Sequence, residues 1–199
     1  MKQEGKLIVI SGPSGVGKST VCDELLRRTG FTRVVTCTTR PPRPGEIDGV
    51  HYHFQAQNDF EDGIRKGLFL EHAAVHGYHY GTPRAPVERG LKDGKTMILN
   101  VDVQGAAQVR ECMRGRGRPG PDVLAGNVVT VFLLPPDREE LKRRLSDRGT
   151  DSREDMEARL KTAEREILEQ EKYDFRVVNA ELDLAVQEIL DSIGYSQDG

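Results

Sequence analysis

The 199-residue chain has no tryptophan, only three cysteines, and 6% aromatic residues. Cys22, Cys37 and Cys112 lie far apart and form no CxxC pair, which favours reduced thiols over a disulfide framework or a cysteine zinc site. No apolar run is long enough to span a membrane, and the N-terminal run is too short for the apolar core of a signal peptide. We therefore expect a cytoplasmic protein without a membrane segment.

A strong excess of one charge is also missing. The formal net charge is −3, whereas a dedicated nucleic-acid-binding domain is usually strongly basic, so no nucleic-acid partner is expected. Charged residues make up 31% and apolar residues 36% of the chain, as in a single α/β domain with a real core. Five histidines gather between His51 and His79, but without the ligand spacing of a metal site, so no histidine metal centre is expected.

Apolar runs alternate with helical patterns along the chain. Buried parallel strands are predicted at Leu7–Ile10, Val34–Cys37, Thr96–Val101 and Val128–Leu134, with a later strand at 175–179. Helices are predicted at Ser19–Arg28, Gln104–Met113, Asp137–Asp147, Arg153–Lys172 and Leu182–Ile193. This alternation predicts an α/β fold with a parallel sheet covered by helices on both faces. Between the second and third strands, "HYHF" and "FLEHAAVHG" predict short strands of a small inserted sheet.

The stretch "SGPSGVGKST" (11–20) fits the P-loop pattern G-x-x-x-x-G-K-[ST] in full. Its glycines allow positive φ angles that turn backbone N–H groups onto phosphate oxygens, and the following helix points its positive end at the same anion. Lys18 is expected to bridge the β- and γ-phosphates, and the Ser19 hydroxyl to ligate Mg²⁺. The predicted ATP-binding residues are Gly12, Pro13, Ser14, Gly15, Val16, Gly17, Lys18, Ser19 and Thr20. A P-loop alone does not define the phosphoryl acceptor.

A second basic motif, "TTRPPRPGE", offers an acceptor site. Two prolines between Arg40 and Arg43 favour polyproline II, which has three residues per turn, so both arginines face the same way. Such a pair of guanidinium groups suits a phosphate monoester. An exposed basic loop is the alternative that composition alone leaves open.

Five motifs occur in a fixed order: "SGPSGVGKST", "TTRPPRPGEIDGVHY", "FLEHAAVHGYHYGT", "VDVQG" and "LKRRLSDRGT". With them the chain, from Leu7 to about Ile193, resembles the guanylate kinase family. The resemblance implies transfer of the γ-phosphoryl group of ATP to GMP in purine nucleotide metabolism, with Mg²⁺ as cofactor and ADP and GDP as products. It further implies one domain: a P-loop NTPase-type core (1–35, 94–136 and 160–199), a small mixed β GMP-binding subdomain (about 36–93) and a helical lid (about 137–159).

The resemblance assigns the acceptor site. It implies that Arg40, Arg43, Tyr52 and Tyr80 hold the GMP phosphate, which two guanidinium groups and two phenol hydroxyls complement well. Glu71 is implied to accept hydrogen bonds from guanine N1–H and the 2-amino group, whereas adenine would present its N1 lone pair to the same carboxylate. The implied GMP-binding residues are Thr36, Arg40, Arg43, Tyr52, Glu71, Tyr80, Thr82 and Asp102.

The resemblance also assigns the catalytic residues, which are Lys18, Arg43, Arg148 and Arg159, with Arg144 in support. Asn179 is implied to lie beside the adenine of ATP. Ser19 and Asp102 are the implied Mg²⁺ ligands, the latter directly or through water. Two positions depart from the family pattern: Asn100 stands where an acid is usual, and Ala180 where Asp usually follows the preceding asparagine. An insertion at 114–126, rich in Gly, Pro and Arg, is interpreted as a passive loop and not as a contact for RNA or a partner.

Two other functions compete with this interpretation. A guanylate-kinase-like scaffold module keeps the fold but loses the P-loop lysine or its glycines, which this chain retains. A sugar-phosphate kinase of similar fold would not need Glu71 or the Tyr52 and Tyr80 pair. Oligomeric state and tolerance of deoxy-GMP stay open at the level of sequence.

Overall fold

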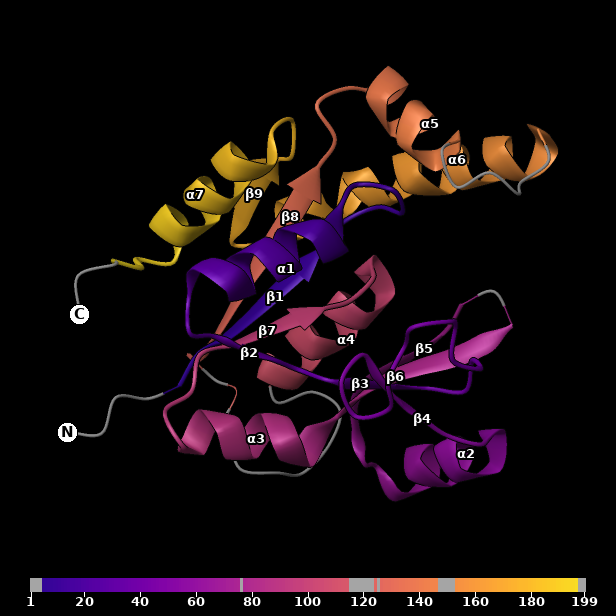
Figure 1. Cartoon of the computed structure of the whole chain (residues 1–199), viewed down its shortest axis with the longest axis vertical. Helices are drawn as coiled ribbons and strands as arrows, with labels where there is room; N and C mark the ends of the chain where they lie inside the picture. Colours follow the sequence, from indigo (N-terminus) through magenta and orange to yellow (C-terminus); the bar gives the residue numbers. More distant parts are fainter. Residues whose placement is uncertain (1–4, 76, 115–123, 125, 147–152, 197–199) are drawn as a thin grey trace. The chain divides into compact units, whose positions relative to one another are not determined.

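The computed structural model describes residues 5–75, 77–114, 124, 126–146 and 153–196. They form two compact units, which are described separately (Figure 1). The first unit contains the described residues of 1–7, 31–99 and 104–128, and the second those of 8–30, 100–103 and 129–199. In the part of the chain described, no helix is both long enough and apolar enough to cross a membrane.

The larger sheet has five strands: β1 (Leu7–Ser11), β2 (Thr32–Arg33), β7 (Met97–Asn100), β8 (Val128–Leu134) and β9 (Phe175–Val178). Their order is β2-β7-β1-β8-β9, and β2 pairs with β7, and β8 with β9, in parallel. All 5 residues of β1 are buried, which explains why its sequence is apolar without alternation. The predicted parallel α/β sheet is confirmed.

Helices of the second unit pack in two pairs (Figure 1). Helix α1 (Lys18–Arg28) packs against α7 (Leu182–Ser192). Helix α5 (Arg138–Ser146) packs against α6 (Arg153–Ile167) through a buried cluster of Leu141, Leu145, Leu160 and Ala163. Truncating one of these leucines to Ala would cost about 2–5 kcal/mol, so the α5–α6 hairpin is held by its own small core. A 3₁₀ turn, η1 (Leu168–Lys172), follows α6.

The first unit contains a four-stranded mixed sheet in the order β4-β3-β6-β5. Its strands are β3 (Thr36–Thr38), β4 (Tyr52–Phe54), β5 (Phe69–Val75) and β6 (Tyr78–Pro83), with β3–β4 parallel and the other pairs antiparallel. Helix α2 (Gln57–Lys66) packs on this sheet, where the Phe60 and Phe69 rings stack with their centroids 4.4 Å apart. Helices α3 (Arg84–Lys92) and α4 (Val103–Met113) complete the helices of this region.

Several sequence-based predictions need correction. The prediction of one core strand at Val34–Cys37 is wrong, because the chain leaves the larger sheet after β2 and enters the mixed sheet at β3. The predicted long helix from Arg153 ends as an α-helix at Ile167 and continues as η1. Helices α2 and α3 and strand β6 were not predicted. Most of the predicted loop at 114–126 lies outside the described residues.

Candidate functional site

The P-loop joins β1 to α1, and two of its glycines occupy positions that exclude any side chain. Gly12 has a φ of 145°, and a Cβ there would lie 2.5 Å from the carbonyl oxygen of Leu133. Gly17 has a φ of 95°, and its Cβ would lie 2.5 Å from Nδ2 of Asn179. Both the left-handed backbone and the close neighbours therefore require glycine, as the motif predicts.

Lys18 begins α1 and folds its side chain back over the loop. Its Nζ donates hydrogen bonds to the carbonyl oxygens of Gly12 at 2.7 Å and Pro13 at 3.0 Å. The helix N-cap is Gly17, which has no side chain to cap the first N–H groups of α1. Those N–H groups, the helix dipole and the Lys18 ammonium together make this loop a site for an anion such as a phosphate.

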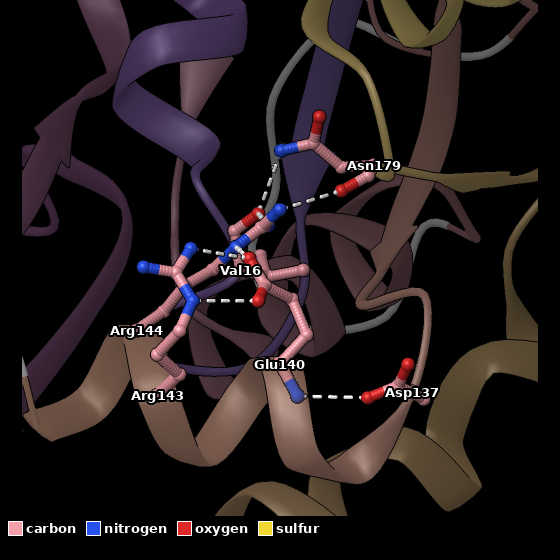
Figure 2. A network of polar contacts seen from close by, with 6 residues as sticks. All are labelled: Val16, Asp137, Glu140, Arg143, Arg144 and Asn179. Carbon is pink, nitrogen blue, oxygen red and sulfur yellow. Dashed lines mark hydrogen bonds and ion pairs between the residues drawn. The ribbon is translucent and has the colours of Figure 1, made fainter.

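A polar network connects the P-loop to α5 and to the end of β9 (Figure 2). Asn179 Nδ2 donates to the carbonyl oxygen of Val16 at 2.8 Å. Arg144, from α5, donates to the same Val16 oxygen at 3.2 Å and to the carbonyl oxygen of Asn179 at 3.0 Å. One P-loop carbonyl is therefore held by side chains from two separate elements, which fixes the peptide just before Gly17.

Glu140 orients Arg144 for this contact (Figure 2). Its carboxylate accepts from Arg144 Nε at 2.8 Å and from Arg143 Nη2 at 2.7 Å. The hydrogen bond from Arg143, followed by that from Arg144, lowers the pKa of Glu140 to about 2, so Glu140 is charged at neutral pH. The Asp137 carboxylate caps α5 by accepting the Glu140 N–H at 2.7 Å.

Helix α6 contributes two further charged side chains to the P-loop. Arg159 Nη2 donates to Ser14 Oγ at 3.2 Å. The Glu166 carboxylate lies near Lys18, Asp102 and the Ser14 backbone, all of which influence its pKa. Burial raises the pKa of the Glu166 carboxyl, Lys18 lowers it and Asp102 raises it. Sequence reasoning missed Glu166, although its position seven residues after Arg159 places both on one helix face.

The residues predicted to lie near Mg²⁺ are Ser19 and Asp102, and Asn100 contacts the first of them. Asn100 Nδ2 donates to Ser19 Oγ at 3.3 Å. The hydroxyl oxygen of Ser19 and the carboxylate of Asp102 are the hard oxygen donors that Mg²⁺ prefers, so the residues present fit this ion. Across the described residues, no group of three or more His, Cys, Asp and Glu side chains could hold a metal ion by itself. Mg²⁺ prefers octahedral coordination by oxygen, so Ser19 and Asp102 would share the ion with phosphate or water oxygens.

In the first unit, the mixed sheet brings Glu71 and Thr82 together. They are directly paired across β5 and β6, and Thr82 Oγ1 donates to Glu71 Oε1 at 2.5 Å. Glu71 is only 4% exposed and Thr82 is fully buried. A carboxylate in such a place is costly unless it is hydrogen-bonded, and the Thr82 hydroxyl supplies one such bond.

A second polar group in the first unit surrounds Arg40, which is 8% exposed. Its guanidinium carbon lies 5.5 Å from the ring centroid of Tyr52, and the Tyr52 and Tyr80 rings meet edge to face at 6.0 Å. Arg40 Nη2 donates to Glu46 at 2.8 Å, and Nη1 to the carbonyl oxygen of Pro41 at 2.8 Å. The hydrogen bond to Glu46, followed by that to Tyr80, raises the pKa of Arg40 against the effect of burial. Burial and then Tyr80 raise the pKa of Tyr52.

Glu46 is the residue of this site that sequence reasoning missed. Its carboxylate accepts from Arg40 and from the Arg43 backbone N–H at 2.7 Å, so it holds both ends of the predicted arginine pair. A left-handed Gly45, with a φ of 85°, turns the chain so that Glu46 can reach back. The "PGE" sequence is typical of such a turn and could have revealed it. Thr36 pairs with Tyr52 across β3 and β4, at the start of β3.

The structure therefore places the predicted residues in two groups. The P-loop, Arg144, Arg159, Asp102 and Asn179 lie in the second unit, and Thr36, Arg40, Arg43, Tyr52, Glu71, Tyr80 and Thr82 lie in the first. Asn179 bonds Val16, and its predicted contact with adenine stays a prediction. Arg148 lies outside the described residues.

The fold and the loop at Gly12–Ser19 define a P-loop phosphate-binding protein of the α/β class. A family model described as guanylate kinase matches residues 4–195, so the chain belongs to the guanylate kinase family. A guanylate kinase from Clostridium tetani is 46% identical over 94% of this chain and 84% of that relative. One from Thermus thermophilus is 47% identical over 94% of this chain and 79% of that relative.

Solved structures give the same result. The crystal structure of a guanylate kinase from Anaplasma phagocytophilum matches with a TM-score of 0.75 and 32% identity, covering 98% of this chain and 87% of that one. A gluconokinase from Sinorhizobium meliloti matches with a TM-score of 0.52 at 17% identity, covering 98% of this chain and 94% of that chain, which shows a shared fold alone. The predicted family and fold class are confirmed, and the chain is placed among the nucleoside monophosphate kinases.

Proposed function

We propose that this protein transfers the γ-phosphoryl group of ATP to GMP, giving ADP and GDP, with Mg²⁺ bound to the donor phosphates. An oxygen of the GMP phosphate attacks the γ-phosphorus, and the bond from that phosphorus to the bridging oxygen of ADP breaks. The electron pair of that bond leaves with ADP. Because a phosphate monoester is already largely ionised at neutral pH, the attacking oxygen needs no general base.

The observation that carries the proposal is the buried carboxylate of Glu71 with one oxygen held by Thr82. Guanine presents N1–H and a 2-amino group side by side, and a carboxylate can accept from both. Adenine offers a lone pair at N1 instead, which would face a negative charge without a proton between them. A buried, preorganised acceptor of this kind can discriminate by ~10⁴-fold or more, because a mismatched base leaves it unpaired.

In this proposal, the phosphate of GMP is bound by Arg40, Arg43, Tyr52 and Tyr80. Arg40, Tyr52 and Tyr80 already lie together, with the guanidinium over one phenol ring. Arginine suits this role because its planar fork of donors matches the oxygens of a phosphate. We assign Thr36 and Asp102 to the same acceptor nucleotide on the family pattern.

The proposed donor site is the P-loop, with Lys18 on the β- and γ-phosphates and Ser19 and Asp102 on Mg²⁺. Mg²⁺ would neutralise charge on the phosphate oxygens of ATP when it is bound. Arg144, Arg148 and Arg159 would stabilise the charge of the transferring group as the α5–α6 lid closes and excludes water. The contact of Arg159 with Ser14 supports this role, since it already holds that guanidinium against the phosphate loop.

The three cysteines support a cytoplasmic location, since Cys22, Cys37 and Cys112 form no disulfide. The substrates we propose are ATP and GMP, without nucleic-acid or membrane partners.

The experiment that tests the proposal measures ADP release with GMP, AMP, CMP and UMP as acceptors at equal concentration. We expect GMP to be used at least ~100-fold more efficiently than AMP, because the site rejects a mismatched hydrogen-bonding edge. Glu71→Gln should lower kcat/KM for GMP by ~100-fold, since one acceptor oxygen becomes an amide donor facing a donor. Equal use of AMP and GMP by the unaltered protein would overturn the proposal.

A further inference from the structure

Strand β5 lies at the edge of the mixed sheet, with β6 on one side. Along an edge strand, every second residue turns its backbone N–H and C=O away from the sheet, and these groups need other partners when they are buried. Glu71 pairs with Thr82 on the β6 side, so its neighbours Leu70 and His72 present their backbone groups to the outer side.

Helix α4 supplies partners for these outer backbone groups. Gln108 Oε1 accepts the His72 N–H at 3.1 Å, and Gln108 Nε2 donates to the His72 carbonyl oxygen at 2.7 Å. Cys112, one helical turn later, donates from Sγ to the Leu70 carbonyl oxygen at 3.5 Å. The Gln108 amide thus imitates a neighbouring strand at one residue, with both of its polar atoms used.

These contacts flank Glu71 on both sides. The pairing register of β5 with β6 shifts between Phe69 and Glu71, so the strand is irregular immediately before the residue that carries the carboxylate. An irregular edge segment is held less firmly by its ladder than a regular one. The Gln108 amide therefore holds the outer side of this segment through two hydrogen bonds to His72.

We propose that Gln108 is a positioning residue for base recognition: by clamping the His72 peptide, it sets the place of the Glu71 carboxylate relative to the base. The inference rests on the proposed role of Glu71 in binding guanine. A carboxylate that accepts from two adjacent donors must be placed within a few tenths of an ångström. A loosely held strand therefore weakens the binding of guanine to Glu71 before it affects phosphoryl transfer.

The test compares Gln108→Ala and Gln108→Glu with the unaltered protein, using GMP and inosine monophosphate (IMP), which lacks the 2-amino group. We expect the KM for GMP to rise about tenfold and the ratio of kcat/KM for GMP over IMP to fall severalfold. The value of kcat and the KM for ATP should stay within about twofold. Gln108→Glu keeps an acceptor for the His72 N–H but turns a second acceptor toward the His72 carbonyl oxygen, so it should be at least as impaired as Gln108→Ala.

A matched control is Gln57→Ala, which removes an exposed side-chain amide that donates to Glu61 at 2.9 Å on the surface of α2. This variant should leave kcat/KM unchanged for both GMP and IMP. Hydrogen exchange at the His72 amide gives a readout independent of activity and should quicken in Gln108→Ala, which removes the acceptor of that N–H.

Unchanged discrimination between GMP and IMP in both folded variants would overturn this inference while leaving the proposed function intact. Equal losses with GMP and IMP would also overturn it, because they would indicate a general structural role. If the unaltered protein used no GMP, the proposed function itself would fail.

Discussion

Thr82 Oγ1 donates a hydrogen bond of 2.5 Å to Glu71 Oε1 across strands β5 and β6. The pairing register creates this contact, because the two residues face each other directly on neighbouring antiparallel strands. The hydroxyl fixes the rotation of the carboxylate by donating to one of its oxygens. The pairing of the two strands therefore holds together two side chains that the family pattern assigns to guanine.

We predict that Thr82→Val raises the KM for GMP by about 10–100-fold with little change in kcat, because a hydrogen bond to a charged group contributes about 1.5–3 kcal/mol. Valine keeps the shape of threonine and removes only the hydroxyl. Steady-state kinetics with varied GMP gives the measurement, and Thr82→Ser, which retains the hydroxyl, is the control. A kcat loss with an unaltered KM would place this pair outside acceptor binding.

The contact of Asn179 with Val16 leads to a prediction for the donor site. Asn179→Asp replaces the donating amide by an acceptor that faces the Val16 carbonyl oxygen. The P-loop peptide therefore loses a hydrogen bond, and the two oxygen atoms repel each other. We expect the KM for ATP to rise by at least about tenfold and the melting temperature to fall, with the KM for GMP unaffected. The control is Gln187→Glu, an amide-to-acid change on the exposed side of α7. An effect confined to GMP would contradict this account of the network.

Arg40 and Glu46 give a prediction about pH. The Arg40 hydrogen bond, followed by that of the Arg43 backbone, lowers the pKa of Glu46 from 4.5 to about 2. A lowered folded-state pKa stabilises the fold above the ordinary value and ceases to do so as the pH falls through the folded value. The difference in unfolding free energy between the unaltered protein and Glu46→Gln should therefore be constant above about pH 5 and shrink between about pH 4.5 and 2.

Urea unfolding at a series of pH values measures this difference. Other carboxylates, such as Glu24 and Glu140, also have a pKa lowered to about 2, but they titrate equally in both proteins and cancel in the comparison. A difference that stayed constant down to pH 2 would show that the ion pair contributes nothing.

Much of the fold was predictable because its strands are buried on both faces. The apolar runs of β1, β7 and β8 need no alternation when helices cover the sheet, so they stand out in the sequence. The mixed sheet was harder, since β3 and β4 have only 3 residues each, too few to show a clear pattern. The prediction of one strand at Val34–Cys37 was wrong because these residues lie where the chain passes from one sheet to the other.

The candidate site was predictable where a motif fixes local backbone, and less so where side chains meet from distant elements. Gly12 and Gly17 follow from the phosphate loop itself. Gln108 and Glu166 could not be assigned, because their roles arise only from the residues that folding brings to them. Local spacing carries no information about such long-range partners.

For the lid, we predict that Arg159→Ala lowers kcat by about 10³-fold while the KM for GMP changes little, because an arginine on the transferring group acts in the transition state. Arg159→Lys should recover little of the rate, since an ammonium lacks the planar fork. Arg40→Ala is the contrast, and it should raise the KM for GMP by loosening the grip on the ground-state phosphate. If Arg159→Ala raised only KM, the residue would belong to binding and not to phosphoryl transfer.

The transfer of label from γ-³²P-ATP tests the central claim most directly. The purified protein is incubated with labelled ATP and Mg²⁺, with GMP or with AMP, and the products are separated. We predict labelled GDP with GMP, almost no labelled ADP with AMP, and loss of the GDP signal in Lys18→Met, because Lys18 holds the transferring phosphates. Label released as inorganic phosphate whether or not GMP is present, or label carried equally to AMP and GMP, would contradict the account.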